Sequence, residues 1–593
     1  MYLRRFAPAG FLALACPCWL AAANQFAQHS LVSDLPGVAD RVDPALVNPW
    51  GIVASPTSPF WLSDNGSGLS TLYNGSGGPI ALKVAVPAPG GKSGGAATGI
   101  IFNGTSSFNV APGKPASFIF ATEDGAIAGW NSQVDQTHAV ILVDRSASGA
   151  VYKGLAMATR SEGPLLYAAN FNSGAISVFD GNLNPVNLPG AFQDSSIPAG
   201  FAPFNIQNLG GTLYVTYAKQ NAQKHDDVAG AGNGYVDVYD LNGLLLQRLV
   251  AGGSLNSPWG LALAPASFGD FGGALLVGNF GSGTINAYDP ATGNLLGQLQ
   301  DVKGNVISIP GLWGLSFGNG SGSGDTNTLY FAAGIPGPAD PVESHGLFGA
   351  IQAAPAIGSN GVFNAASYQP GIAPGGFASI KGLNLSITTR SWGTNDFVNG
   401  ALPTQLDNVS VTVNGKPAYV YFVSPRQINF ITPADATQGA VPVIVTNNGF
   451  RSAAVNAQLQ EFSPGFFVIQ NGKYIVATHA DGSLVGPASL LPSLTTPARP
   501  GETITLYGTG FGPTNPATDG QVLPAPVPAA TQPAVSIGGV AASVTFAGLT
   551  SAGLYQVNVQ VPAMVSGGDA PVIAQAGTGK SQANVFIAVS SSN

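Results

Sequence analysis

The chain has 593 residues and a net charge of −8, and only 8% of its residues are charged although 45% are hydrophobic. This length exceeds a single hydrophobic core, and the apolar content is too high for a disordered chain, so we expect several folded domains. The negative charge and the lack of a Lys/Arg cluster argue against a nucleic-acid partner, whose phosphates would have to be neutralised. The 80 Gly and 45 Pro residues favour an all-β chain with many turns.

The first 23 residues have the pattern of an export signal. Two arginines precede an apolar stretch over residues 6–20, and three alanines at 21–23 offer a cleavage site. We therefore predict a signal peptide over 1–23 and a mature protein that is secreted, periplasmic or at the cell surface. Its removal would also remove Cys16 and Cys18, and with them every thiol of the chain.

A lipoprotein acylated at Cys16 is the alternative, although Ala13 stands where such signals usually carry Leu. No segment outside the signal reaches the ~18 consecutive apolar residues of a membrane span, so we predict no transmembrane segment.

A degenerate repeat of about fifty residues begins near residue 47 and ends near 351. Five copies place a glycine inside an apolar strand, and one copy has asparagine there. These positions are Gly51, Gly99, Gly154, Asn205, Gly260 and Gly314. Short strands at this period are typical of β-propeller blades, so we predict a six-bladed β-propeller over 24–352.

Each copy continues with a second strand, a glycine turn and a third strand of alternating polarity, as in residues 174–180 and 234–240. A ring of blades needs its ends paired, because an open strand edge promotes aggregation. We expect residues 29–33 to add the outer strand to the last blade, beside residues 345–351.

Beyond residue 353 the pattern changes to two units that repeat at roughly 125 to 130 residues. Their short strands and frequent turns predict immunoglobulin-like β-sandwiches. We place a linker at 353–361, the first unit at 362–465, and a linking segment with the second unit at 466–593. The predicted fold class is all-β: a six-bladed propeller followed by two immunoglobulin-like units.

Two family resemblances accompany these patterns. The motifs NPWGIV, NFNSGAISVFD and SPWGLAL, with the loop at 224–227, resemble an uncharacterised bacterial family of secreted six-bladed propellers, distantly similar to NHL-type propellers. The motifs FNAASY, APGG, QINFITP, PGETITLYGTGFGP and YQVNVQVP resemble an uncharacterised acidobacterial C-terminal domain of the IPT/TIG immunoglobulin-like group. Neither resemblance implies an established activity or catalytic residues.

Oxygen-bearing side chains at the ends of second strands form the first candidate site. Asp64, Asn170 and Asn279 each lie four residues before a hairpin glycine, and Glu123 lies nearby in the second copy, next to Asp124. If these ends converge at the channel mouth, hard oxygen ligands there suit Ca²⁺. The alternative is turn formation, since Asn and Asp bond to their own backbone. No cofactor is otherwise required, and Ca²⁺ is the candidate.

The densest charge cluster, at 224–227, lies in a long loop of the fourth copy, and such loops are often functional. His225 beside Asp226 suits a base or a metal site, while the alternative is a solvated loop tip.

Trp50, Trp259 and Trp313 share one position beside the repeated small residue. They predict either an aromatic platform for a sugar at one channel mouth or a core between blades.

These observations favour a secreted, non-enzymatic binding protein with the immunoglobulin-like units as spacers or adhesion modules. Its ligand is unknown, with a polysaccharide or a cell-surface protein as candidates. The alternatives are a metal-dependent propeller hydrolase or lactonase, by analogy of fold alone, and a structural surface or matrix protein.

Overall fold

The computed structural model describes residues 25–591, so the predicted signal peptide and both cysteines lie outside the described residues. This part of the chain is all-β; its α-helix is the four-residue α1 (Gln470–Lys473). Within it, no helix is long and apolar enough to cross a membrane. The described chain forms two compact units, divided between Ala354 and Pro355.

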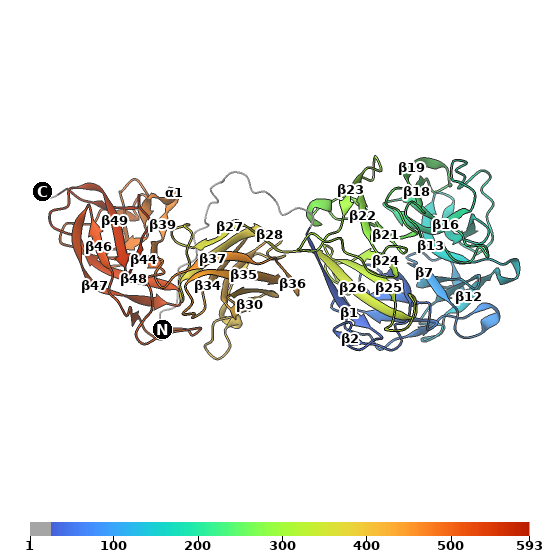
Figure 1. The fold of residues 1–593 in the computed structure, drawn as a ribbon, viewed down its shortest axis with the longest axis horizontal. Helices are drawn as coiled ribbons and strands as arrows, with labels where there is room; N and C mark the ends of the chain where they lie inside the picture. The colour runs from blue at the N-terminus through green and yellow to red at the C-terminus, as the bar shows by residue number, and fades with distance from the viewer. Residues whose placement is uncertain (1–24, 592–593) are drawn as a thin grey trace. The chain divides into compact units, whose positions relative to one another are not determined.

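The first unit is a six-bladed β-propeller, as the repeat predicts, with the blades following one another from blue to yellow-green (Figure 1). Each blade starts with its inner strand and continues outward. The first blade contains β3 (Pro49–Val53), β4 (Phe60–Asp64), β5 (Leu69–Tyr73) and β6 (Val84–Ala85), and the second contains β7 (Ala97–Phe102), β10 (Phe118–Thr122), β11 (Ala126–Trp130) and β12 (Val140–Asp144). The third contains β13 (Tyr152–Arg160), β14 (Gly163–Asn170) and β15 (Ala175–Asp180), and the fourth contains β16 (Phe201–Leu209), β17 (Thr212–Lys219), β18 (Tyr235–Tyr239) and β19 (Leu245–Ala251). The fifth contains β20 (Pro258–Leu263), β21 (Leu275–Asn279), β22 (Ile285–Tyr288) and β23 (Leu295–Gln298), and the sixth contains β24 (Leu312–Phe317), β25 (Leu329–Ile335) and β26 (His345–Ala353).

The repeated glycine lies where the inner strand of one blade packs against that of the next. A Cβ atom on Gly51 would lie 2.6 Å from the carbonyl oxygen of Thr98, and one on Gly314 only 2.5 Å from that of Trp50. The contact therefore recurs around the ring, and at the glycine positions it leaves no space for a side chain. In the fourth blade Asn205 makes the contact instead, because its amide donates to the Trp259 carbonyl at 2.7 Å.

Gly260→Ala is expected to destabilise the propeller by about 2–3 kcal/mol, since its Cβ would lie 2.4 Å from the rigid Trp313 carbonyl. Gly278 is the matched control: it pairs with Gly260 in the same blade, but the nearest atoms to a Cβ there are leucine side-chain carbons, at 3.2 Å or more. Urea unfolding of both variants measures the difference. Equal losses of stability would contradict the close backbone contact as the reason for the repeat.

The ring is closed by β1 (Phe26–Ser33), which pairs antiparallel with β26 from Phe26 opposite Ala353 to Ser33 opposite Leu347. Figure 1 shows the blue β1 beside the yellow-green β26. The predicted closure is therefore confirmed, and the strand begins three residues earlier than expected. Phe26 is buried against Phe268 and Phe271 of the fifth blade, with ring centroids 4.8 and 5.7 Å away.

An ion pair secures this closure. Asp34, just after β1, contacts His345 Nδ1 through Oδ2 at 2.6 Å and accepts the Gly346 N–H through Oδ1 at 2.8 Å. His345 Nε2 lies 3.3 Å from Asp340. The hydrogen bond to Asp34, together with Asp340, raises the pKa of His345 above its usual value.

This pair predicts that the propeller melts at a higher temperature in mild acid than in mild alkali. Because the pKa is raised in the folded state, the stabilisation is complete below about pH 6.5 and is lost as the pH rises through the folded pKa. Melting temperatures at pH 6 and pH 9 check this, and the difference should shrink in His345→Gln. It should persist in His138→Gln, whose imidazole is 65% exposed. An unchanged difference in His345→Gln would contradict the assignment.

The second compact unit begins with a β-sandwich. One sheet contains β27 (Ala356–Asn364), β28 (Phe377–Leu383), β34 (Gln427–Ile431), β33 (Tyr419–Ser424) and β29 (Arg390–Ser391). The other contains β30 (Gln405–Leu406), β31 (Val409–Val413), β35 (Gly439–Asn447), β36 (Phe450–Arg451), β37 (Val455–Leu459) and β32 (Lys416–Pro417). Buried aliphatic side chains of both sheets fill the space between them.

The start of this sandwich differs from the predicted linker at 353–361, because β27 already begins at Ala356. The glycine-rich stretch 358–361 lies inside the strand as an irregularity, where the register against β28 shifts between Ile357 and Val362. Such bulges accept Gly and Asn, which is why the composition resembles a loop.

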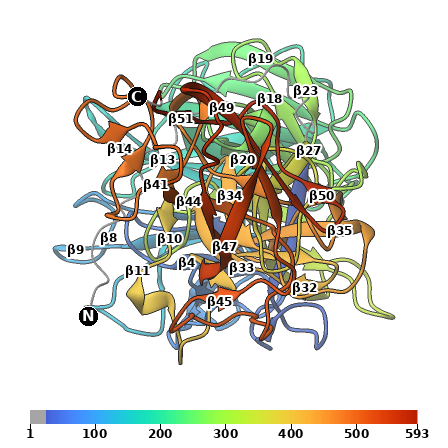
Figure 2. The ribbon, with the colours of Figure 1, turned by 90° about the vertical axis from the view of Figure 1, so that its left-hand side faces the viewer.

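A second sandwich follows, shown from two sides in Figures 1 and 2. Its long strands are β44 (Thr503–Thr509), β46 (Ala534–Ile537), β47 (Val540–Ser551), β48 (Leu554–Gln560), β49 (Gly568–Ala576) and β51 (Phe586–Val589). The segment predicted to link the units forms short strands that join these sheets: β38 (Gly465–Phe466), β39 (Val468–Ile469), β40 (Tyr474–Ile475), β41 (Ala477–Thr478), β42 (Leu484–Val485) and β43 (Thr495–Thr496).

Candidate functional site at the channel mouth

Charged side chains from several blades gather where the inner strands begin. In each blade the second strand runs antiparallel to the inner strand, so its end lies beside the start of the inner strand, as Pro49 does beside Asp64. The loops after the second strands therefore surround one mouth of the channel. They carry Glu123 after β10, His225 and Asp226 after β17, and Glu343 after β25.

Lys153 is the centre of this cluster. It lies in β13, is 1% exposed, and forms an ion pair with Glu123. Its Nζ lies 3.7 Å from Asp226 Oδ1 and 4.8 Å from the centroid of the Trp50 ring. The Lys153 ammonium thus lies between the carboxylates of Glu123 and Asp226 and the face of the Trp50 ring. A buried charge is costly unless it is paired, so this lysine depends on its carboxylates.

Lys153 was missed by the sequence analysis, yet a signal for it exists. The residue before the ring position is Trp50, Trp259 and Trp313 in three blades and Phe204 in a fourth. Lysine at the same position in the third blade breaks this aromatic pattern. A lysine aligned with buried tryptophans indicates a buried charge, and comparison of the copies at this position would have identified it.

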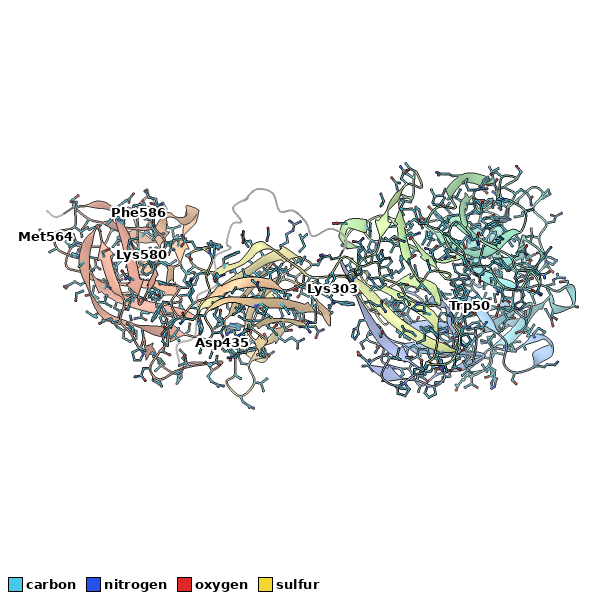
Figure 3. The ribbon with its side chains drawn as sticks, in the orientation of Figure 1. Trp50, Lys303, Asp435, Met564, Lys580 and Phe586 are labelled. Carbon is cyan, nitrogen blue, oxygen red and sulfur yellow. The ribbon has the colours of Figure 1, made fainter. Side chains whose placement is uncertain are left out.

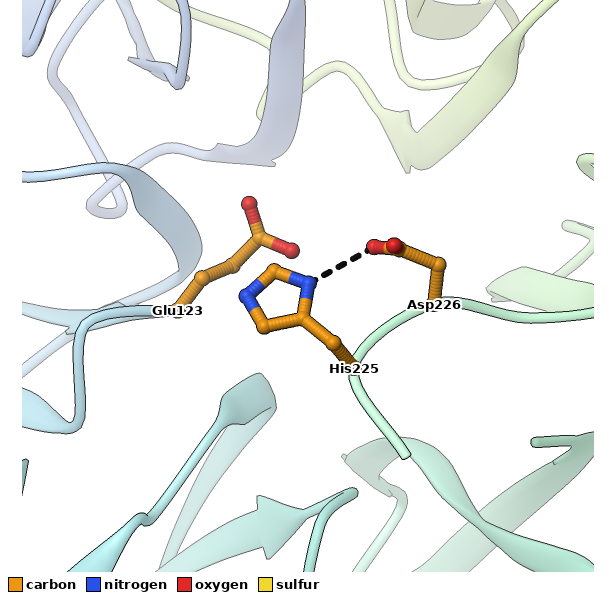
Figure 4. Close-up of side chains that lie close together, drawn as sticks. All are labelled: Glu123, His225 and Asp226. Carbon is orange, nitrogen blue, oxygen red and sulfur yellow. Dashed lines mark hydrogen bonds and ion pairs between the residues drawn. The ribbon is translucent and has the colours of Figure 1, made fainter. Parts of the chain in front are cut away.

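The exposed side of the cluster contains Glu123, His225 and Asp226 (Figure 4). His225 Nδ1 lies 2.8 Å from Asp226 Oδ1, and one ligand-type atom of each of the three residues lies within 4.8 Å of the others. Asn65 donates to Glu123 Oε2 at 2.8 Å, and Asn221 Oδ1 accepts the His225 N–H at 3.1 Å. His225 and Asp226 remain 47% and 62% exposed, so solutes can reach them.

Two further carboxyl groups complete an acidic mouth. Burial raises the pKa of Glu343 to about 7, and the charge of Glu123 adds to this rise. Burial also raises the pKa of Asp227. Asn48 donates to Glu343 Oε1 at 3.3 Å. Four carboxyl groups thus surround one lysine. Near pH 7 the partial protonation of Glu343 reduces the excess negative charge.

The other predicted metal ligands are used by the backbone of their own blades. Asp64 Oδ2 accepts the Thr71 N–H at 2.9 Å, and burial raises the pKa of Asp64 well above its usual range. Asn170 Oδ1 accepts the Val151 N–H at 3.2 Å, and Asn279 Oδ1 accepts the Asn256 N–H at 2.9 Å. This placement fits the alternative of turn and loop capping. Only Glu123 of the four predicted ligands takes part in the carboxylate–imidazole cluster of the described residues.

The three tryptophans lie inside the propeller, where Figure 3 labels Trp50. We call Trp50, Trp259 and Trp313 the tryptophan cluster. They are 2%, 4% and 1% exposed, Trp50 stacks on Trp313 at 3.5 Å, and Trp259 meets both edge-on. A sugar platform needs an open ring face, so that interpretation does not fit, whereas the interpretation as core does.

One family model matches part of the chain, and curated relatives match about half of its length. Residues 371–463 match the IPT/TIG domain model. The uncharacterized protein R648 of Acanthamoeba polyphaga mimivirus is 33% identical over 330 residues, which are 54% of this chain and 78% of the relative. The uncharacterized protein L690 of the same virus is 33% identical over 316 residues, 51% of this chain and 80% of the relative. Both relatives are viral, so the bacterial origin implied by the resemblance stays a prediction.

Among solved structures, a streptogramin B lyase is 10% identical, with a TM-score of 0.34 over 55% of this chain and 97% of that protein. This likeness carries no argument about activity.

Proposed function

The chain belongs to the family of the uncharacterized mimivirus proteins R648 and L690, and we propose that it is a binding protein whose propeller holds a cationic ligand at the channel mouth. The excess of carboxyl groups around Lys153 carries this proposal. In a chain with only 8% charged residues, gathering so many carboxyl groups at one mouth costs stability, and a bound cation would offset the cost.

A divalent metal ion is the simplest such ligand. Glu123 and Asp226 supply carboxylate oxygens and His225 an imidazole nitrogen, a set that suits Zn²⁺, while the oxygens alone suit Ca²⁺. The IPT/TIG domain supports a role in interaction, with a polysaccharide or a cell-surface protein as the proposed partner. The predicted signal peptide supports action outside the cytoplasm, in the periplasm, at the cell surface or as a secreted protein.

Thermal unfolding of the full chain with CaCl₂ or ZnCl₂ tests the proposal. We expect saturating ion to raise the melting temperature of the propeller by several degrees, because a ligand stabilises the state that binds it. Asp226→Asn should abolish the shift, and His225→Ala should abolish it for Zn²⁺ alone. Glu162→Gln is the control, since this 68% exposed carboxylate lies in the turn between β13 and β14. If neither Ca²⁺ nor Zn²⁺ shifted the melting temperature, metal binding at this mouth would be rejected.

The affinity for Ca²⁺, which uses the oxygen ligands alone, should also rise with pH. Glu343 has a pKa of about 7, so it is largely protonated at pH 6 and ionised at pH 8. Ionisation adds a negative charge next to the ion, and we expect roughly tenfold tighter binding at pH 8, measured by calorimetry. The gain should disappear in Glu343→Gln, and an equal gain in that variant would contradict this role.

Metal-dependent hydrolysis is a second candidate, favoured by the half-exposed His225 that Asp226 orients at 2.8 Å. A histidine oriented by a carboxylate beside a metal can act as a general base. Turnover of lactones or aryl esters that requires metal and is lost in His225→Ala would favour hydrolysis, whereas binding without turnover would favour the first proposal.

A further inference from the structure

The channel continues beyond the tryptophan cluster as a cavity of about 260 Å³. Its lining comes from the inner strands of all six blades, at and beyond the ring position, as with Ile52, Ile100 and Leu155, and also includes Trp259, which lies one residue before it. The charged mouth is formed by residues before the ring position and by the loops beside them. The two regions are therefore at opposite ends of the inner strands.

The cavity is lined by uncharged residues, whereas the mouth is lined by charged ones. None of the described residues that line it is ionisable. Aliphatic side chains from all six blades form most of the wall, including Ile206 of the fourth blade. Gln207 adds a polar group on the side of the fourth blade, where the amides of Asn205 and Asn208 are already bonded to the carbonyls of Trp259 and Met157. A charged ligand would lose its hydration here without gaining a partner, so the lining favours an uncharged molecule.

A buried donor at this site lacks an acceptor. The indole Nε1 donors of the tryptophan cluster have no hydrogen-bond partner within the described part of the protein, and Trp259, which is 4% exposed, is the member of the cluster that lines the cavity. Buried donors are nearly always satisfied, so an unpaired one indicates a missing acceptor. At the far ends of the inner strands, Gln207, Asn208 and Ser316 are half-buried, so the cavity opens towards solvent there.

We propose that this cavity binds a small, uncharged, mainly apolar molecule that carries one oxygen acceptor, such as a medium-chain amide or alcohol. Aliphatic walls enclose the chain of the ligand, and the Gln207 amide or the Trp259 indole meets its polar end. The site is independent of the proposed cation site, because the buried tryptophan cluster and the ring contacts lie between them.

Calorimetric titration of the full chain with hexanamide, hexanoate and hexylammonium tests the proposal. We expect saturable binding of hexanamide and at least tenfold weaker binding of the two charged analogues. Ser316→Phe, which fills the cavity from its half-buried end, should weaken hexanamide binding at least tenfold. Asp226→Asn, at the other mouth, should leave it unchanged.

Gln207→Leu provides a second variant in case Ser316→Phe disturbs folding. It removes a polar group from the lining, so hexanamide should bind several-fold more weakly while hexane binding is retained. Circular dichroism confirms that each variant is folded. Failure of wild type to bind hexanamide, equal binding of hexanoate, or unchanged binding in both cavity variants would each overturn the proposal, and none of these results would bear on the cation site.

Discussion

Deletion of residues 26–33 is expected to abolish cooperative unfolding of the propeller, while the sandwich unit keeps its own transition. Phe26, Leu31 and Val32 of β1 are 1%, 4% and 1% exposed. Burial of each such side chain contributes ~1.5–3 kcal/mol, so their loss removes about 5–9 kcal/mol. A folded domain is stable by only about 5–15 kcal/mol, so the loss is comparable with the whole stability of the ring.

The deletion also opens an edge. Without β1, the backbone of β26 loses a partner along seven residue pairs. Exposed edges of this kind pair with other chains, so the truncated protein should aggregate on heating. Calorimetry of the deletion variant measures both effects, because it resolves the propeller transition from that of the sandwiches.

Two point variants distinguish the contribution of buried side chains from that of the backbone pairing of β1. Phe26→Ser should lower the melting temperature strongly, because it removes the ring that packs on Phe268 and Phe271. Gln28→Ser changes an exposed residue of the same strand and should have little effect. A peptide of residues 24–36 should restore the melt of the deletion variant when added in excess. An unchanged melt after deletion would show that β1 does not close the ring.

The propeller was predictable because its ring imposes one requirement on every blade. Each inner strand must approach its neighbour closely, and glycine at five of the six ring positions allows this, so Gly51, Gly154 and Gly314 recur at the blade period. The start of the first sandwich was harder to predict from the sequence, since the bulged strand β27 has the composition of a linker. The alternation of polar and apolar residues indicates which face of a strand is buried. It does not indicate a bulge, because a bulge depends on how the strand pairs with its neighbour.

The site was predictable only as separate fragments. Glu123 was selected as a metal ligand, and His225 with Asp226 as a reactive loop, and the antiparallel blade strands bring these fragments to one mouth. Glu343 was not selected, because it lies in an irregular loop where periodicity gives no position. The tryptophans were ambiguous, since buried and exposed aromatic residues look alike in sequence until the neighbouring blades are placed.

Lys153→Met is expected to destabilise the propeller by about 3–5 kcal/mol, because it leaves Glu123 and Asp226 without the buried cation that pairs with both. Lys303→Met, at an exposed loop position, should stay within about 0.5 kcal/mol of wild type. Addition of Glu123→Gln to Lys153→Met should recover much of the loss, because the closest uncompensated carboxylate is then removed. Urea unfolding of the single and double variants gives these differences.

The pH dependence of this loss distinguishes electrostatics from packing. Lowering the pH from 8 to 6 protonates Glu343, whose pKa is about 7, and so relieves repulsion among the carboxylates that remain. The defect of Lys153→Met should therefore be smaller at pH 6, whereas a packing defect would be the same at both values. Divalent cations should also stabilise Lys153→Met more than wild type, because the ion can then occupy the place of the ammonium. A pH-independent defect that cations do not relieve would make Lys153 a packing residue and would remove the main support for a cation site at the mouth.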